Sequence, residues 1–293
     1  MRKKPTIHYF FNRHFFAGDY RPQLEIPGLT TSYDPRKLLS ADVVLVHLPS
    51  ILSTNVADQL LRLHSIAPSS QVWVAQSMES AANYPHMFDH GFMSIFQLEV
   101  SYRQEADIWT PYVPRTLKSE YQTIRPGNRR RRFCSFVSSS WDLSGRRKFL
   151  MELSRLVKID SYGNFMRNRW LLLDRGETTK LRILQKYVFT LALENSIAHD
   201  YVTEKFYQPL MTGTIPIYLG APNIDEFAPG ENCFINATDF AGPEELASFL
   251  DDIEPTAYHD WRRHDLRIPF MQKVDRLAVN WQVELSKQLL EAI

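Results

Sequence analysis

Short apolar runs alternate with helix-like stretches along this chain, and the alternation limits the folds that it can adopt. Residues 42–48 read Asp-Val-Val-Leu-Val-His-Leu, and residues 71–75 read Gln-Val-Trp-Val-Ala. Between them, residues 56–66 place leucines at a helical spacing. Near-continuous Val and Leu runs are typical of strands that are buried on both faces of a parallel sheet. The pattern predicts βαβ units, with a first strand at residues 6–11.

The alternation resumes after a break in composition at residues 121–132. This stretch contains a Pro-Gly turn followed by four arginines, and we expect an interdomain linker there. The length of 293 residues also suggests two domains. We therefore expect an α/β protein with domains at 1–125 and 126–268 and a C-terminal helix at 269–293. The further strands are expected at 132–137, 157–162, 187–193 and 214–219, and the further helices at 147–156, 202–211 and in much of 251–290.

The charge balance argues against a protein that coats nucleic acid. The chain has 34 Lys and Arg against 33 Asp and Glu, whereas such proteins usually carry a broad basic excess. No run approaches the ~18 consecutive apolar residues of a membrane span, so we expect a soluble, cytoplasmic chain. We expect the four arginines, residues 129–132, to form a solvated segment. The alternative is that they attract the chain peripherally to the anionic surface of the inner membrane.

Motifs of the common cofactor and metal sites are absent from the sequence. It has no GxG, GK[ST], HExxH or Asp-x-Asp pattern, which argues against a glycine-fingerprint dinucleotide fold, a P-loop and a divalent ion held by paired aspartates. Cys134 and Cys233 lie far apart and indicate neither a disulfide framework nor a zinc site. We therefore predict no metal site.

The segment from residue 187 to residue 240 is the most informative one. A buried strand delivers Glu194, Asn195 and Ser196 to its carboxyl end, where α/β sheets place ligands. The next helix opens at residues 203–205, Thr-Glu-Lys. Its free N–H groups and the charge of its lysine suit a diphosphate. Pro209 stands inside this helix and is expected to bend it or end it.

This segment resembles the signature of the α-1,3-fucosyltransferases, glycosyltransferase family 10. The matching pieces are Phe-x-Leu-x-Leu-Glu-Asn-Ser at 189–196, Asp-Tyr-Val-Thr-Glu-Lys at 200–205 and Pro-Ile-Tyr-Leu-Gly at 216–220. Weaker agreement at residues 78–84 and 101–112 extends the resemblance into the first expected domain.

The resemblance implies a GT-B architecture, in which two Rossmann-like domains face each other across a cleft. The second domain would hold GDP-L-fucose, and an oligosaccharide acceptor would approach from the first. The implied reaction is inverting transfer of L-fucose from GDP-β-L-fucose to the 3-hydroxyl of GlcNAc in an N-acetyllactosamine-type glycan, which gives a Lewis x-type product. No cofactor is required, while stimulation by Mn²⁺ and an α-1,4 linkage stay open. The alternatives are another GDP-sugar used on a surface polysaccharide, or a catalytically silent protein that binds nucleotide sugars or glycans.

The resemblance also assigns roles to individual residues. It implies that Glu79 takes the proton of the acceptor hydroxyl, and that Lys205 with either Arg146 or Arg147 stabilises the departing diphosphate. Glu194 is either an electrostatic group of the reaction or a structural anchor for the loop after it. Two departures from the family pattern are Ser140, where the family has Asn, and Ala81, where it has Pro. The other expected donor-binding residues are Ser138, Ser140, Asn195, Tyr201 and Glu204.

Overall fold

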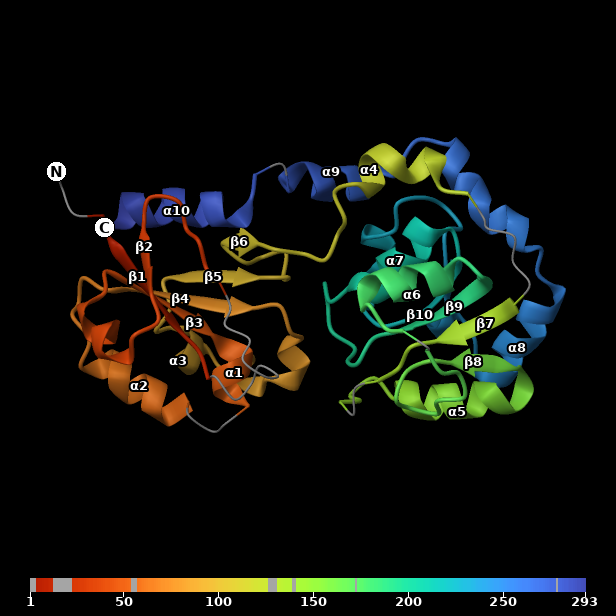
Figure 1. The fold of residues 1–293 in the computed structure, drawn as a ribbon, viewed down its shortest axis with the longest axis horizontal. Helices are drawn as coiled ribbons and strands as arrows, with labels where there is room; N and C mark the ends of the chain where they lie inside the picture. The colour runs from red at the N-terminus through yellow and green to blue at the C-terminus, as the bar shows by residue number, and fades with distance from the viewer. Residues whose placement is uncertain are drawn as a thin grey trace. The chain divides into compact units, whose positions relative to one another are not determined.

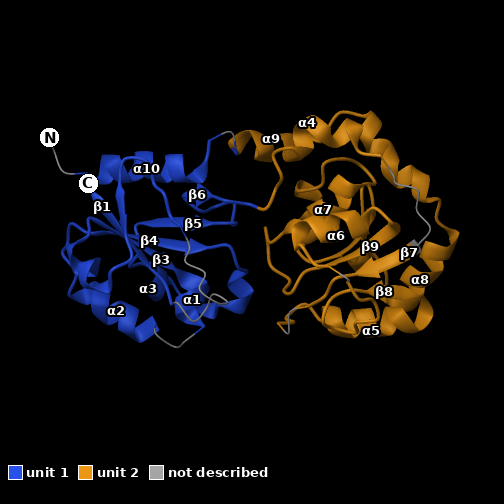
Figure 2. Cartoon of the chain, in the orientation of Figure 1, with its two compact units in different colours: residues 1–111, 277–293 blue, residues 112–276 orange. Residues whose placement is uncertain are grey.

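The computed structural model describes residues 4–12, 23–53, 57–125, 131–138, 141–171, 173–277 and 279–293. The chain forms two compact units, unit 1 with residues 1–111 and 277–293 and unit 2 with residues 112–276 (Figure 2). Ser140 and the first two of the four arginines lie outside the described residues, so the membrane contact that is the alternative reading of that run stays a prediction. No helix in the described ranges is both long enough and apolar enough to cross a membrane.

Among the described residues of unit 1, six parallel strands form a sheet in the order β2-β1-β3-β4-β5-β6 (Figure 1). Alternate residues of one strand serve opposite faces: Val43 and Leu45 pack into one core, and Val44 and Val46 pack into the other. Burial on both faces explains the near-continuous apolar runs of the sequence. The strands are β1 Thr6–Phe10, β2 Thr30–Ser32, β3 Val43–His47, β4 Val72–Ser77, β5 Leu98–Ser101 and β6 Ile108–Trp109.

Helices cover both faces of this sheet. The helices that follow β3 and β4 bury Leu48, Leu60 and Phe92 against one face, and the C-terminal helix buries Leu285 and Leu289 against the other. The α-helices of unit 1 are α1 Leu48–Leu52, α2 Ala57–Ser65, α3 His90–Met93 and α10 Trp281–Ala292, and the 3₁₀-helices are η2 Pro35–Ser40, η3 Ala81–Asn83 and η4 Pro85–Phe88.

In the described part of unit 2, five parallel strands form a sheet in the order β11-β10-β9-β7-β8. The chain passes from β7 to β8 on one side and later returns to β9 on the other side, so the strand order reverses between β7 and β9. Ligands of open α/β sheets bind outside the carboxyl ends of the strands at such a reversal. The strands are β7 Arg131–Ser135, β8 Ile159–Ser161, β9 Tyr187–Leu193, β10 Ile215–Leu219 and β11 Ile235–Asn236.

Helices also cover both faces of the second sheet. α5 and α8 bury leucines into the core on one face, whereas α6 buries Ile183 and Leu184 on the other, beside Cys134. The α-helices are α4 Leu117–Glu120, α5 Arg146–Leu156, α6 Glu177–Leu184, α7 Glu204–Thr212, α8 Pro243–Asp252 and α9 Ile268–Arg276, and the 3₁₀-helices are η5 Tyr121–Thr123, η6 Ile224–Glu226, η7 Ala237–Asp239 and η8 Pro255–Arg263.

The units divide the chain at positions other than the expected 125 and 268. Unit 2 begins at Tyr112, and residues 277–293 belong to unit 1. The first difference has a packing reason, since the Tyr121 ring stacks on Trp261 of unit 2 with 6.0 Å between the ring centroids. The second follows from the apolar face of α10, which completes the core of unit 1 with Leu285.

Candidate active site

A cavity of about 220 Å³ lies at the carboxyl ends of β7 and β9, where the strand order reverses. The loop after β7, strand β9, the first residue of α5 and residues of α6 and α7 contribute to its wall. Apolar side chains, two hydroxyl side chains, three cations and a carboxylate form the wall. The lining residues are Phe136, Val137, Ser138, Arg146, Lys180, Leu184, Thr190, Leu191, Leu193, Glu204, Lys205 and Pro209.

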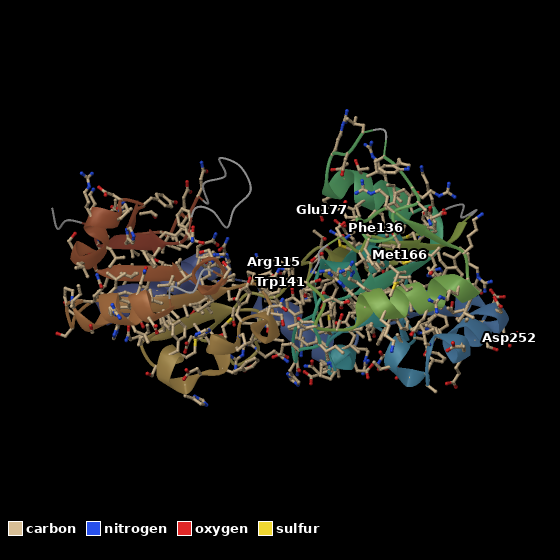
Figure 3. All side chains as sticks on the ribbon, turned by 90° about the horizontal axis from the view of Figure 1, so that it is seen from below. Arg115, Phe136, Trp141, Met166, Glu177 and Asp252 are labelled. Carbon is tan, nitrogen blue, oxygen red and sulfur yellow. The ribbon has the colours of Figure 1, made fainter. Side chains whose placement is uncertain are left out.

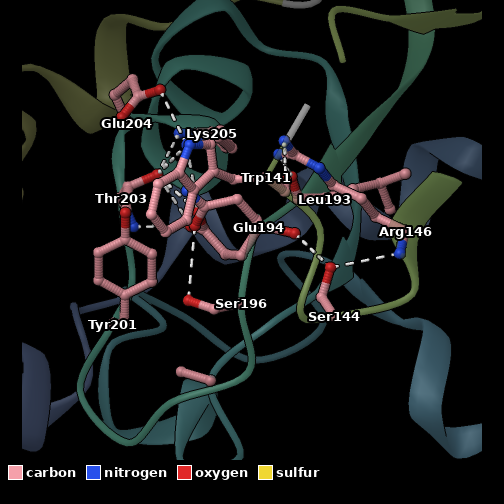
Figure 4. A network of polar contacts seen from close by, with 12 residues as sticks. Trp141, Ser144, Arg146, Leu193, Glu194, Ser196, Tyr201, Thr203, Glu204 and Lys205 are labelled. Atoms are coloured by element: carbon pink, nitrogen blue, oxygen red, sulfur yellow. Dashed lines mark hydrogen bonds and ion pairs between the residues drawn. The ribbon is translucent and has the colours of Figure 1, made fainter. Parts of the chain in front are cut away.

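Glu194, the residue after β9, is completely buried beside this cavity. Its Oε1 accepts hydrogen bonds from the backbone N–H of Thr203 at 2.8 Å and from the Thr203 hydroxyl at 2.9 Å (Figure 4). Its Oε2 lies 3.2 Å from Nζ of Lys205. Burial raises the pKa of Glu194, and the Lys205 ammonium acts against this shift. With both oxygens directed at the start of α7, Glu194 fixes the place where that helix begins, which is the geometry of an anchor.

Lys205 belongs to the first turn of α7 and makes two ion pairs. Its Nζ lies 3.2 Å from a carboxylate oxygen of Glu194 and 3.2 Å from Oε1 of Glu204, and it donates to the Thr203 hydroxyl at 3.0 Å. Burial opposes the charge, but the two carboxylates outweigh burial and raise the pKa of Lys205. The ammonium is therefore charged at neutral pH, at the positive end of a helix. The helix continues to Thr212, so the alternative that it ends at Pro209 is wrong.

Arg146 and Arg147 begin α5 but have different surroundings. Arg146 is 2% exposed and lines the cavity, and its guanidinium donates to the carbonyl oxygens of Leu193 at 3.2 Å and Trp141 at 3.0 Å. The Arg147 guanidinium carbon lies 4.3 Å from the centroid of the Phe165 ring, and Arg147 is not among the residues that line the cavity. The geometry favours Arg146 as the arginine that faces a ligand.

Two polar residues outside the sequence-based predictions hold the segment before α5: one caps the helix, and the other bonds to the residue after β9. The carboxylate of Asp142 accepts hydrogen bonds from the backbone N–H groups of Arg146 at 3.0 Å and Arg147 at 3.1 Å. The Ser144 hydroxyl donates to the carbonyl oxygen of Glu194 at 2.6 Å. An acidic residue shortly before a helix is a capping signal that the sequence does carry.

Two further expected donor residues lie on the loops that follow β7 and β9. Ser138 lines the cavity, and its hydroxyl accepts a hydrogen bond from the backbone N–H of Asn164 at 3.2 Å. The carbonyl oxygen of Asn195 accepts a hydrogen bond from the backbone N–H of Leu143 at 2.8 Å. This backbone contact joins the loop after β9 to the segment before α5, so Asn195 is held at the same end of the sheet as Arg146.

Tyr201, another expected donor residue, is buried in the loop that leads into α7. Its side chain is 2% exposed. Its ring meets the Tyr112 ring edge-to-face, with 6.4 Å between the centroids. Tyr201 therefore packs against the first residue of unit 2 and does not line the cavity.

Gly220 directly follows β10, the strand next to β9, and allows close packing around Glu194. A Cβ at this position would lie 2.6 Å from Cγ of Glu194 and 2.4 Å from the hydroxyl of Tyr218, both of which are fully buried. We expect Gly220→Ala to lower the free energy of unfolding by about 1–3 kcal/mol, as overpacking does, measured by urea denaturation. Gly242→Ala is the matched control, because its nearest contact would be 3.4 Å away. Equal stability of the two variants would contradict this prediction.

Glu79 lies in unit 1, two residues after β4, and its side chain is half-buried. The Ser77 hydroxyl donates to the Glu79 carbonyl oxygen at 3.0 Å, and Ala81 N–H donates to the Tyr102 hydroxyl at 2.9 Å, so this loop is held at both ends. Burial, with the negative charge of Glu79 as the second cause, raises the pKa of Tyr84 to about 12. The loop therefore presents a carboxylate at the carboxyl edge of the first sheet.

Family models match nearly the whole chain. The model described as "Fucosyltransferase, N-terminal" matches residues 2–113, and "Glycosyltransferase family 10 (fucosyltransferase) C-term" matches residues 127–288. The second match contains every expected donor-binding residue, and the first contains Glu79.

Curated relatives agree with these matches. The chain is 32% identical over 217 residues to "Alpha-(1,3)-fucosyltransferase B" of Drosophila melanogaster, which covers 67% of this chain and 49% of that protein. It is 27% identical over 263 residues to "4-galactosyl-N-acetylglucosaminide 3-alpha-L-fucosyltransferase 9" of Bos taurus, with 86% and 69% covered. The chain thus spans about half to two thirds of the length of these relatives.

The fold has a solved counterpart. The structure described as "Crystal Structure of alpha1,3-Fucosyltransferase with GDP-fucose" matches with a TM-score of 0.59 and 15% identity, over 96% of this chain and 94% of that one. The match confirms the expected GT-B class, with two parallel α/β units and a helical C-terminal end.

Proposed function

Because the chain belongs to glycosyltransferase family 10, the fucosyltransferases, we propose that it transfers L-fucose from GDP-β-L-fucose to the 3-hydroxyl of GlcNAc in an N-acetyllactosamine-type glycan. One observation carries the proposal: Lys205 and Arg146 line the same cavity at the strand-order reversal of the unit that matches the family's C-terminal model. The name of the bovine relative, a 3-α-L-fucosyltransferase of 4-galactosyl-N-acetylglucosaminide, supports this acceptor.

The proposed reaction is a single displacement with inversion at the anomeric carbon. Glu79 accepts the proton of the acceptor hydroxyl while that oxygen bonds to the anomeric carbon of fucose. The bond from this carbon to the β-phosphate oxygen breaks on the opposite side, and GDP leaves with the bonding electrons. Arg146 and Lys205 then stabilise the negative charge that develops on the diphosphate.

The other site residues have supporting roles in this scheme. Glu204 keeps Lys205 charged and directed, since its carboxylate lies 3.2 Å from the ammonium. Glu194 anchors the start of α7 and thereby positions both residues. Ser138 and Asn195 are proposed to contact the nucleotide from the loops after β7 and β9. Tyr201, which is buried, supports the loop that leads into α7.

The test is to incubate the protein with GDP-fucose and N-acetyllactosamine. We expect release of GDP and a product heavier by one deoxyhexose, with the α-1,3 linkage read by NMR. Transfer from GDP-mannose instead would identify another GDP-sugar as the donor. Binding of GDP-fucose without product across GlcNAc and glucose acceptors would identify a silent binding protein.

We propose that turnover requires no metal ion. The Arg146 and Lys205 cations supply positive charge where a divalent ion would otherwise neutralise the leaving diphosphate. Turnover should therefore stay within about twofold after treatment with EDTA, a change of less than about 0.5 kcal/mol in the barrier. Addition of Mn²⁺ to the treated protein is the control. Loss of activity with EDTA and its return with Mn²⁺ would refute the proposal.

A further inference from the structure

A second cavity, of about 400 Å³, opens beside the first one. Three residues line both cavities: Phe136 and Ser138 after β7, and Lys180 from the first turn of α6. In Figure 3 the labels of Phe136 and Glu177 mark the loop after β7 and the first residue of α6. Lys180 therefore stands where the two cavities adjoin.

The cations of the site differ in how far the protein already offsets their charge. Lys205 is paired with Glu194 and Glu204, and Arg146 donates to two carbonyl oxygens. Lys180 makes no ion pair and no hydrogen bond with the described part of the chain, and its Nζ lies 5.7 Å from the centroid of the Phe136 ring. Of these three cations, Lys180 has the charge that the protein offsets least.

The surroundings of Lys180 destabilise its positive charge unless an anion lies nearby. Burial lowers the pKa of Lys180, the neighbouring Lys205 adds to this, and the carboxylates of Glu204, Glu194 and Glu177 act against it. An anion between Lys180 and Lys205 would be attracted by both ammonium groups and would stabilise their charged forms. A phosphate group has this charge and several acceptor oxygens.

The second cavity has the chemistry for the rest of a nucleotide. Phe136 and Tyr162 stack with 5.2 Å between their centroids and 14° between their planes, and both line the cavity. Trp170 lines it as well and is 77% exposed. Aromatic faces stack on a planar base. A nucleotide with its base in this cavity would therefore place its phosphates beside Lys180.

We propose that Lys180 is a donor-binding residue that contacts the diphosphate together with Arg146 and Lys205. The inference rests on the proposed function for the identity of the nucleotide, but not for the kind of group that Lys180 binds. No motif in the sequence points to Lys180, because its importance comes from the partners that it lacks within the described residues and from the two cavities that it joins.

The test compares Lys180→Met with Lys180→Arg and with a control, Lys186→Met, since Lys186 is exposed and lines neither cavity. Binding of GDP is measured by calorimetry, and binding of guanosine, which lacks phosphate, by saturation-transfer NMR. We expect Lys180→Met to weaken GDP binding about 10- to 100-fold, as loss of a charged hydrogen bond does. Guanosine binding should persist, Lys180→Arg should keep most of the GDP affinity, and Lys186→Met should match the wild type.

Several results would overturn the inference. These are an unchanged GDP affinity in Lys180→Met, equal losses in Lys180→Met and Lys180→Arg, or an equal loss for GDP and guanosine, which would indicate a structural role. Binding of UDP and ADP to the wild type distinguishes a failure of the inference from a failure of the proposed function. If the wild type binds one of them in place of GDP with the same dependence on Lys180, the donor assignment fails and the inference stands. A wild type that binds no nucleoside diphosphate would overturn both.

Discussion

Glu79→Gln is expected to lower turnover by about 10²- to 10⁴-fold, the usual contribution of a general base, and to leave GDP affinity unchanged. Glutamine keeps the size of the side chain but has no carboxylate to accept the acceptor proton. The proposed donor-binding residues belong to unit 2, whereas Glu79 belongs to unit 1, so the variant should lower kcat without changing the affinity for GDP. Steady-state kinetics with N-acetyllactosamine and calorimetry with GDP make the comparison.

The control for this prediction is Glu25→Gln, which removes a carboxylate from an exposed position of unit 1. A titration of Tyr84 provides a second readout, because the charge of Glu79 contributes to its raised pKa. In Glu79→Gln that pKa should fall from about 12. Normal turnover in Glu79→Gln would show that another residue is the base.

Lys205→Met is expected to lower kcat/KM by about 10²- to 10³-fold, which is the usual effect of removing one oxyanion-hole donor. It should also lower the free energy of unfolding by about 3 kcal/mol, because Glu194 stays buried without its cation. This loss of stability lies at the low end of the range for a buried charge without its partner, because Thr203 still donates two hydrogen bonds to Glu194. Urea denaturation and steady-state kinetics measure the two effects.

The double variant Lys205→Met/Glu194→Gln separates stability from donor binding. It removes the buried carboxylate, so stability should recover while GDP affinity stays low. Lys205→Met alone should also lose stability as the pH rises from about 4. The reason is that Glu194 keeps its carboxyl proton to a higher pH in the folded state than in the unfolded chain. Recovery of GDP affinity in the double variant would mean that Lys205 acts only through Glu194.

The sequence predicted the elements whose signal is local. The strand expected at 187–193 has those bounds in the structure, because its apolar run is buried on both faces. The helix that carries Glu204 and Lys205 was expected at 202–211 and lies at Glu204–Thr212. Its capping residue, Thr203, is visible in the sequence, and so are the polar residues that follow β9.

Features that depend on contacts between residues far apart in the sequence could not be predicted from local patterns. The helix Glu177–Leu184 was not predicted, since it is short and its preceding segment has no clear periodicity. The geometry that favours Arg146 over Arg147 depends on the carbonyl oxygens of Trp141 and Leu193, which lie near the Arg146 guanidinium only in the folded chain. Likewise, nothing in the apolar face of α10 tells which of the two sheets it covers.

The return of α10 to unit 1 has a consequence for dissecting the protein. Residues 1–111 on their own lack Leu285 and Leu289, which are both fully buried against the sheet that contains Ile7 and Leu45. A fragment of this kind would expose an apolar sheet face and would tend to aggregate. A gene in which residues 277–293 are joined ahead of residue 1 would encode unit 1 as one continuous segment, since circular permutation moves a terminal helix without changing what it packs against.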